Sequence, residues 1–180
     1  LAHYDYWDNK VRRSILLDAK ADILVYGMGE RQILEIANRL NADENIQKID
    51  DVRGTVVIKN NLDSYENLSS EIENIPTFEE VSSDKKLFNL AFKKIYENQV
   101  PASAKILIQQ TGSRFIIHNP PQFPYQTKEL DDVFELPYQN NWHPFYDNIG
   151  GVPSFETVKF SVISNIGCTG ECYFCSIFIH

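Results

Sequence analysis

The chain has 180 residues, of which 43% are hydrophobic, so it can bury a sizeable core as one domain together with part of another. Its formal net charge of -8 argues against bulk electrostatic attraction to nucleic acid, which needs clustered lysines and arginines. No apolar stretch approaches the ~20 residues of a membrane helix, and the first residues do not have the pattern of a signal peptide, so we expect a cytoplasmic protein.

The first third of the chain alternates between predicted strands and helices. A helix is predicted at residues 8–19, because Val11, Ile15 and Leu16 share one helical face. The elements predicted after it are a strand at 21–26, a helix at 32–40 and a strand at 54–58. This order of strand, helix and strand favours a parallel sheet.

A Gly27-Met28-Gly29 turn joins the first of these strands to the helix, and a turn of this kind can hold a dinucleotide. The full fingerprint needs a third glycine or an alanine where this chain has Gln32. It also needs an acidic residue at the end of the next strand, which is not clear here. A tight turn that enters the helix at Glu30 explains the same residues without a ligand. We favour that structural interpretation and leave the ligand open.

The middle of the chain holds a polar segment, a long helix and a hairpin. Residues 63–75 are polar and weakly periodic, which predicts an exposed connection. A helix is predicted at 85–99, with an apolar stripe that is typical of core. That stripe follows Leu87, Leu90, Ala91, Lys94 and Ile95 and is widened by Phe88 and Phe92. β-rich runs on both sides of Thr111-Gly112-Ser113 predict a hairpin over 104–118.

The segment after the hairpin is rich in proline. Residues 119–124 are predicted to form an extended connector, because prolines remove backbone donors and restrict their neighbours. A short acidic helix is predicted at 126–134. We expect His118, at the end of the hairpin, to be structural. For His143, before Pro144, a hydrogen-bonded turn residue is favoured over a ligand or an acid–base group.

Three cysteines, Cys168, Cys172 and Cys175, follow a predicted buried strand at 156–163, and they are the only cysteines of the chain. Cysteine thiolates are the usual protein ligands of a [4Fe–4S] cluster, and three of them leave one iron open to substrate or cofactor. Two alternatives stay open. One is a Cys3His zinc site completed by His180. The other is a disulfide with a spare thiol, although nothing in the sequence signals secretion.

Phe174 stands directly before Cys175, so the motif reads C-x3-C-x-aromatic-C and resembles that of radical S-adenosylmethionine (SAM) enzymes. The resemblance implies that Cys168, Cys172 and Cys175 hold the cluster, that SAM chelates the open iron, and that Phe174 lies beside the adenine. It also implies reductive cleavage of SAM to a 5′-deoxyadenosyl radical, with an electron from a reductant such as flavodoxin or ferredoxin. It does not identify the substrate.

The order of short motifs along nearly the whole chain resembles the YgiQ-type radical SAM proteins. The matching segments are Tyr4-Asp-Tyr-Trp7, Lys10-Val-Arg-Arg-Ser14, Tyr26-Gly-Met-Gly-Glu-Arg31, Asn119-Pro-Pro121, Glu129-Leu-Asp131, Leu136-Pro137, His143-Pro144-x-Tyr146 and Lys159-Phe-Ser161, followed by the cysteines, Ser176-Ile177 and His180. The family pattern often has Arg-Gly before the first cysteine and Gly-Gly before the second, where this chain has Ile166-Gly167 and Gly170-Glu171. The resemblance implies a protein of three parts: an N-terminal α/β domain, a radical SAM barrel and a C-terminal extension.

We therefore predict an α/β fold, in which a Rossmann-like parallel or mixed sheet carries flanking helices, a β-hairpin and a Pro-rich connector. Residues 1–151 are assigned to the N-terminal domain and residues 152–180 to the first strand and cluster loop of the barrel, as an internal piece of a longer protein. The predicted function is that of a radical SAM enzyme whose partners are SAM and an unknown substrate, with no membrane and no strong nucleic-acid signal. Two alternatives are an accessory or interaction domain that is inactive alone, and a zinc-stabilised Cys3His binding module.

Overall fold

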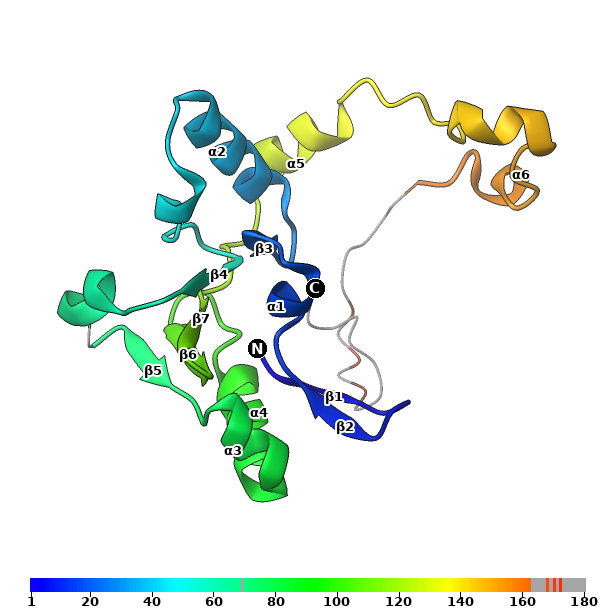
Figure 1. Ribbon diagram of the computed structural model, residues 1–180. Helices are drawn as coiled ribbons and strands as arrows, with labels where there is room; N and C mark the ends of the chain where they lie inside the picture. The colour runs from blue at the N-terminus through cyan, green and yellow to red at the C-terminus, as the bar shows by residue number, and fades with distance from the viewer. Residues whose placement is uncertain (69, 163–167, 169, 171, 173–180) are drawn as a thin grey trace. The chain divides into compact units, whose positions relative to one another are not determined.

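The computed structural model describes residues 1–68, 70–162, 168, 170 and 172. The chain divides into two compact units, Leu1–Pro124 and Tyr125–His180, and each unit is described by itself (Figure 1). The predicted domain boundary at residue 151 falls inside the second unit and stays a prediction. Within the described ranges, no helix has the length and apolar character that crossing a lipid bilayer requires.

A five-stranded mixed sheet forms the centre of the first unit. In spatial order its strands are β3 (Ile23–Val25), β4 (Thr55–Lys59), β7 (Arg114–His118), β6 (Ile106–Thr111) and β5 (Ile72–Asn74). Neighbouring strands are antiparallel except for β5 and β6, which pair in parallel. The predicted mixed sheet with flanking helices is thereby confirmed.

The predicted parallel pairing of the first two sheet strands is wrong, because β3 and β4 run antiparallel, with Val25 opposite Thr55. The connection between them contains α2 (Glu30–Asn41) and the 3₁₀ helix η1 (Ile46–Lys48). After α2, η1 returns the chain to the edge of the sheet where β3 ends. There the Tyr26 N–H donates to the Gly54 carbonyl at 2.9 Å. A single helix would have left the chain at the opposite edge and allowed parallel pairing.

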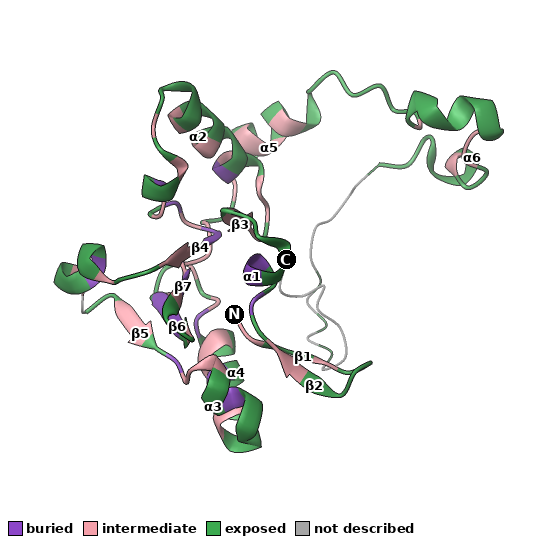
Figure 2. Cartoon of the chain, in the orientation of Figure 1, coloured by how far each residue is buried: buried purple, intermediate pink, exposed green. Residues whose placement is uncertain are grey.

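Hydrophobic side chains cover both faces of the sheet, since successive residues of a strand point to opposite faces. The cluster on one face consists of Val57, Tyr65, Ile106, Ile108 and Ile117. The clusters on the other face consist of Leu16, Leu17, Val56 and Ile116, and of Ile75, Val81, Ala91 and Leu107. The 3₁₀ helix η2 (Asp63–Leu68) therefore packs on the first face, and α1 (Ile15–Ala19), α3 (Phe78–Ser83) and α4 (Lys85–Glu97) pack on the second (Figure 2).

The predicted helix at residues 8–19 is correct only in its last turns, which form α1. The residues before it form a hairpin of β1 (His3–Asp5) and β2 (Lys10–Arg12). The Asp5 carboxylate accepts hydrogen bonds from the backbone N–H groups of Trp7 and Asp8, and Asn9 has a φ of 50°. These local hydrogen bonds compete with helix formation and favour a turn. The spacing of apolar residues, on which the helix was predicted, contains no information about them.

The polar segment 63–75 is more ordered than predicted. It contains η2 and the edge strand β5, and the Tyr65 side chain is buried in the core. The expectation of a purely exposed connection is therefore wrong. Most of its polar residues are exposed. In the sequence they hide the pattern of the few apolar residues that anchor the segment to the sheet.

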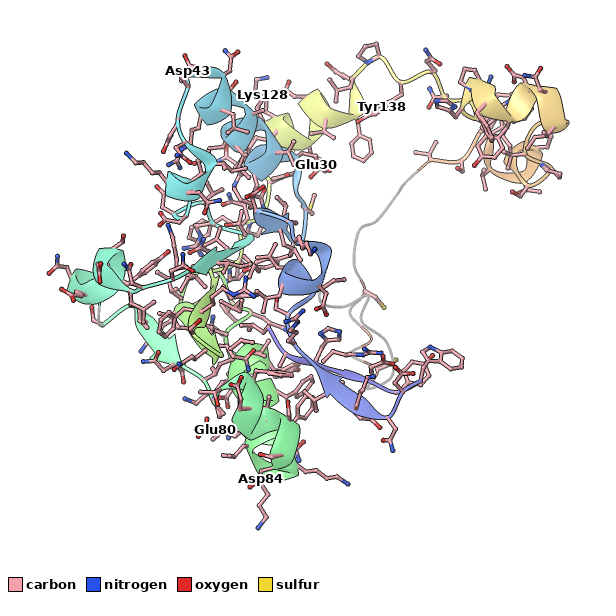
Figure 3. All side chains as sticks on the ribbon, viewed as in Figure 1. Glu30, Asp43, Glu80, Asp84, Lys128 and Tyr138 are labelled. Atoms are coloured by element: carbon pink, nitrogen blue, oxygen red, sulfur yellow. The ribbon has the colours of Figure 1, made fainter. Side chains whose placement is uncertain are left out.

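The helices α3 and α4 start at well-formed caps. Thr77 and Glu80 form a capping box at the start of α3, and the Asp84 carboxylate accepts the Lys86 N–H at 2.7 Å at the start of α4 (Figure 3). The predicted long helix and the hairpin of β6 and β7 are confirmed. The apolar stripe of α4 is core only in part, since Leu90 and Phe92 are 43% and 61% exposed.

The second unit contains α5 (Thr127–Phe134), the 3₁₀ helix η3 (Pro144–Ile149) and α6 (Phe155–Val158). The predicted connector at 119–124 and the predicted helix at 126–134 are confirmed. The predicted strand at 156–163 is wrong over its described residues, because α6 occupies its start and Phe160 and Val162 are exposed. A β-rich segment needs a neighbouring strand to satisfy its backbone groups, and the described part of this unit contains none.

Candidate functional site

Two of the three predicted cluster ligands, Cys168 and Cys172, lie within the described residues, and both are exposed free cysteines. The Gly170 N–H donates to the Cys168 Sγ at 3.3 Å, and the Cys172 Sγ lies 3.7 Å from the Gly170 carbonyl oxygen. A Cβ on Gly170 would lie 3.3 Å from the Cys168 sulfur and 3.6 Å from the Cys172 sulfur. Both sulfurs therefore approach the same glycine, and one of them already accepts a backbone hydrogen bond, as metal-bound thiolates commonly do.

The rest of the predicted site, namely Cys175, Phe174 and the possible zinc ligand His180, lies outside the described residues. Across the described ranges, no three His, Cys, Asp or Glu side chains are placed to hold a metal ion. The donors in the described part of this segment, two thiols that each approach Gly170 and one backbone N–H, are suited to iron or zinc. They do not distinguish the two.

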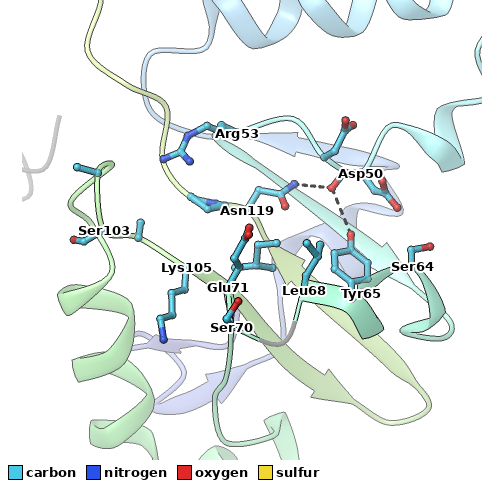
Figure 4. A pocket seen from close by; sticks show the side chains of 15 residues that line it. Asp50, Arg53, Ser64, Tyr65, Leu68, Ser70, Glu71, Ser103, Lys105 and Asn119 are labelled. Atoms are coloured by element: carbon cyan, nitrogen blue, oxygen red, sulfur yellow. Dashed lines mark hydrogen bonds between the residues drawn. The ribbon is translucent and has the colours of Figure 1, made fainter.

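A pocket of about 600 Å³ lies at one edge of the sheet in the first unit (Figure 4). At this edge β4, β5 and β6 begin and β7 ends, so that the segments before or after four strands meet there. Arg53, Glu71 and Lys105 come just before β4, β5 and β6, and Asn119 follows β7. The volume is in the range of small-molecule sites.

The innermost polar groups of the pocket are Asn119 and Tyr65, which are 2% and 6% exposed. The Asn119 Nδ2 donates to the Asp50 carbonyl at 2.9 Å and to the Thr55 Oγ1 at 3.0 Å. The Tyr65 hydroxyl lies 3.4 Å from the same Asp50 carbonyl, which is a long hydrogen bond (Figure 4). Burial raises the pKa of Tyr65 well above its ordinary value, so this hydroxyl stays protonated.

Arg53 connects the pocket to the Pro-rich segment. Its Nε and Nη2 donate to the Pro121 carbonyl at 3.1 and 2.8 Å, and Nη2 also donates to the Pro101 carbonyl at 2.7 Å. The guanidinium lies 4.4 Å from the centre of the Phe123 ring. Burial lowers the pKa of Arg53, but a guanidinium remains charged at any physiological pH. These contacts hold the Pro-rich segment against the sheet edge.

A family model described as Radical SAM N-terminal matches residues 1–161. The chain belongs to this family.

Two relatives match the chain beyond residue 161, through the cysteines. A UPF0313 protein of Clostridium botulinum (strain ATCC 19397 / Type A) is 46% identical over 179 residues, which are 99% of this chain and 27% of that protein. A UPF0313 protein of Clostridium perfringens (strain ATCC 13124) is 45% identical over 179 residues, which are again 99% of this chain and 27% of that protein. The chain thus spans about a quarter of the length of the curated relatives it matches. The predicted relation to the YgiQ-type radical SAM proteins is confirmed, and no solved structure matches the chain.

The turn that contains Gly27 and Gly29 follows β3 directly and lies at the same edge of the sheet as the pocket. Gly27 has a φ of 73°, which favours glycine, and a Cβ on Gly29 would lie 2.9 Å from the Val25 Cγ1. Backbone conformation explains the first glycine and close packing explains the second. Neither needs a nucleotide to explain it, which supports the structural interpretation of the turn.

The two histidines considered in the sequence have structural contacts. The His118 ring stacks on Tyr26 at 4.5 Å between centroids, and burial lowers its pKa to about 4, with a further contribution from the Leu1 amino group. It is therefore neutral near pH 7. The His143 Nδ1 accepts the Phe145 N–H at 3.1 Å and caps η3, as expected for a turn histidine.

Sequence reasoning missed the pocket. Its residues come from separate segments of the chain, including η2 and the start of β6, and the sequence pattern places Asn119 only in the Pro-rich connector. The one available signal was the placement of polar residues immediately beside strand ends, at Arg53, Lys105 and Asn119. That signal becomes informative only when the strand order is known.

Proposed function

We propose that this chain is part of a radical SAM enzyme in which Cys168, Cys172 and Cys175 ligate one [4Fe–4S] cluster and SAM binds the fourth iron. Phe174 would lie beside the adenine of SAM. When both are bound and an external reductant such as flavodoxin or ferredoxin supplies one electron, the cluster and SAM provide a 5′-deoxyadenosyl radical that abstracts a hydrogen atom from a substrate of unknown identity.

The observation that carries this proposal is a C-x3-C-x-aromatic-C motif in a chain that belongs to the radical SAM N-terminal family. The family model ends at residue 161, but the relatives match through the cysteines at 46% identity. The approach of the Cys168 and Cys172 sulfurs to Gly170 supports the first two ligands. The third ligand rests on the sequence motif alone.

The protein's own groups would position and tune this site. The Gly170 N–H that donates to the Cys168 Sγ would stabilise a bound thiolate and raise the reduction potential of the metal, because hydrogen bonds to sulfur withdraw charge from it. Gly170 also leaves space between the two sulfurs that a side chain would fill. The Cys172 thiol would lose its proton when it binds.

The test uses the full-length protein, reconstituted anaerobically with iron and sulfide. We expect about four irons and four sulfides per chain, an EPR signal of a reduced [4Fe–4S] cluster that changes when SAM is added, and 5′-deoxyadenosine when dithionite and SAM are both present. Cys172→Ala should remove all three. Ser154→Ala, which changes a small exposed side chain of the same unit, should leave them intact.

Two results would contradict the proposal. Stoichiometric zinc with no iron or sulfide would instead favour the Cys3His module that includes His180. A cluster whose EPR signal is indifferent to SAM, with no 5′-deoxyadenosine formed, would indicate an electron-transfer or structural role.

We further propose that the 180-residue chain alone does not cleave SAM. It spans 27% of the length of its C. botulinum relative, and the other contacts to SAM and the substrate pocket would lie in the remainder. The same assay on the isolated chain should give no 5′-deoxyadenosine above the Cys172→Ala background. Product above that background would contradict this part of the proposal and leave the first part intact.

A further inference from the structure

Six aromatic residues of the first unit form a surface that no step of the proposed function uses. This aromatic surface consists of Tyr4, Tyr6 and Trp7 of the β1–β2 hairpin and Phe88, Phe92 and Tyr96 of α4. The hairpin lies beside α3 and α4, and β2 contacts α3 (Figure 1).

Two ring contacts occur among these residues, and one of them joins the hairpin to α4. The Tyr4 ring meets the Phe88 ring edge-on, with 6.5 Å between centroids, and the Tyr6 and Trp7 rings lie 4.9 Å apart. Phe88, Phe92 and Tyr96 are spaced by four residues, so they follow one face of α4 over successive turns. The contact of Tyr4 with Phe88 therefore joins the aromatic face of α4 to the hairpin.

Most of this aromatic surface faces solvent. The exposed fractions are 50% for Tyr4, 68% for Tyr6, 82% for Trp7, 61% for Phe92 and 50% for Tyr96. With 150–250 Å² for each ring residue, these five side chains expose roughly 600 Å². That area is at the upper end of what monomeric proteins expose and reaches the lower end of interfaces between domains.

The core does not account for these positions. α4 already contributes Ala91 to the buried cluster around Leu107, with Phe88 and Ile95 packed against it. Phe92 and Tyr96 lie outside that cluster. A helix that only covered the sheet would have polar residues at such positions.

Hydrogen bonds and ion pairs order the turn of the hairpin. Asp5 accepts the Trp7 and Asp8 backbone N–H groups, and the Arg12 guanidinium pairs with both Asp5 and Asp8. The Tyr4 hydroxyl donates to the Asn9 Oδ1 at 2.6 Å. This network fixes the turn before any contact is made, so little ordering is left to oppose binding.

We propose that the aromatic surface is the face on which the remainder of the full-length polypeptide docks against this domain. Relatives show that most of such a polypeptide lies outside this region, since the match covers 27% of their length. A tethered domain meets the surface at an effective concentration of the order of millimolar, well ahead of a free partner. Aromatic residues are also enriched at the centres of protein interfaces.

The test is photo-crosslinking in the full-length protein, with p-benzoylphenylalanine introduced in place of Trp7 or of Phe92. The control site is Glu66, an exposed residue of η2 on the other side of the sheet. We expect cross-linked peptides from residues beyond 180 of the same chain, at least fivefold more abundant from both aromatic positions than from Glu66. Mixing ¹⁴N- and ¹⁵N-labelled chains distinguishes links within one chain from links between two.

Three results would overturn the proposal: links that join labelled to unlabelled chains, links confined to residues 1–180, and yields no greater than from Glu66. A second measurement excludes misfolding as the cause of a negative result. In Phe92→Asp, hydrogen exchange should increase in the contacted segment while β6 and β7 stay protected. Neither measurement needs a cluster or SAM, so each can fail while the proposed function holds.

Discussion

The two units of this chain use apolar residues in opposite ways. In the first unit, three clusters of buried side chains cover both faces of the sheet. In the second unit, none of the described residues is buried, and Val158, Phe160 and Val162 are 55%, 89% and 86% exposed. The first unit is therefore held by its own packing, and the second is held by local turns and caps. Three comparisons between matched positions and one dependence on pH test this difference.

Deleting a core leucine should show the largest effect. Leu107 is fully buried, and Leu107→Ala should lower the free energy of unfolding of the chain by about 2–5 kcal/mol, because it leaves a cavity in the sheet. Leu136→Ala in the second unit, where the side chain is 52% exposed, should cost less than about 0.5 kcal/mol. Urea unfolding followed by far-ultraviolet circular dichroism measures both. Equal losses would mean that the second unit shares the core.

Acid should destabilise the first unit through His118. Its pKa in the folded chain is about 4 instead of 6.5, so the unfolded chain binds the proton first. The stabilisation from a neutral His118 is fully present above pH 6.5 and is lost as the pH falls toward 4. The loss is about 3 kcal/mol at most.

His118→Phe keeps an aromatic partner for Tyr26 and should flatten the unfolding free energy between pH 6.5 and 4.5. Asp5 and Glu44 have lowered pKa values, because Asp5 accepts the Asp8 N–H and Glu44 pairs with Arg39. Their contributions are lost only below their ordinary values of 3.8 and 4.5. The contribution of the Leu1 amino group, whose pKa burial lowers from 8.0 to about 6, is lost mainly between pH 8.0 and about 6. Most of the loss in this window therefore belongs to His118. An unchanged slope in the variant would exclude this assignment.

Two glycines with positive φ distinguish packing from backbone strain. Gly54 has a φ of 72°, and a Cβ there would collide with the Gln32 side-chain amide, which is fully buried. Gly150 has a φ of 94° and open space around it. We expect Gly54→Ala to cost about 2–3 kcal/mol and Gly150→Ala about 1 kcal/mol in thermal unfolding. Similar costs would show that Gln32 moves aside.

Helix caps should give the smallest difference. The Thr77 hydroxyl accepts the Glu80 N–H at 3.2 Å in the capping box of α3, so Thr77→Ala should cost about 1 kcal/mol. Ser154 precedes α6 without a side-chain cap, and Ser154→Ala should change the unfolding free energy by less than about 0.3 kcal/mol. Thermal unfolding of the two variants in one buffer tests the pair. A loss at Ser154 as large as at Thr77 would contradict the assigned caps.

The sequence predicted those parts of the fold that are specified locally. The 3.6-residue spacing of Ile33, Ile36 and Leu40 identified α2, and the Thr111-Gly112-Ser113 turn identified the β6–β7 hairpin. The antiparallel pairing of β3 with β4 was missed, because it depends on where a long connection returns the chain. The strand predicted at 156–163 was wrong over its described residues, 156–162, because β propensity acts only when a neighbouring strand is present.

The candidate site divides in the same way. The spacing of Cys168, Cys172 and Cys175 is a local motif and could be found in the sequence, together with Phe174. The pocket around Asn119 and Tyr65 could not, since its residues are brought together by strand order and not by spacing. Asn119 was visible only as the residue before two prolines.

The two tryptophans of the chain lie in different units, and this decides what intrinsic fluorescence can report. Trp7 is already 82% exposed, so its emission should change little when the first unit unfolds. Trp142 donates to the Asp147 carboxylate at 2.7 Å and meets the Phe155 ring edge-on at 5.2 Å. Tryptophan emission during heating will therefore follow the loss of the Trp142 contacts in the second unit. The melting of the sheet will pass nearly unseen in fluorescence, however cooperative it is.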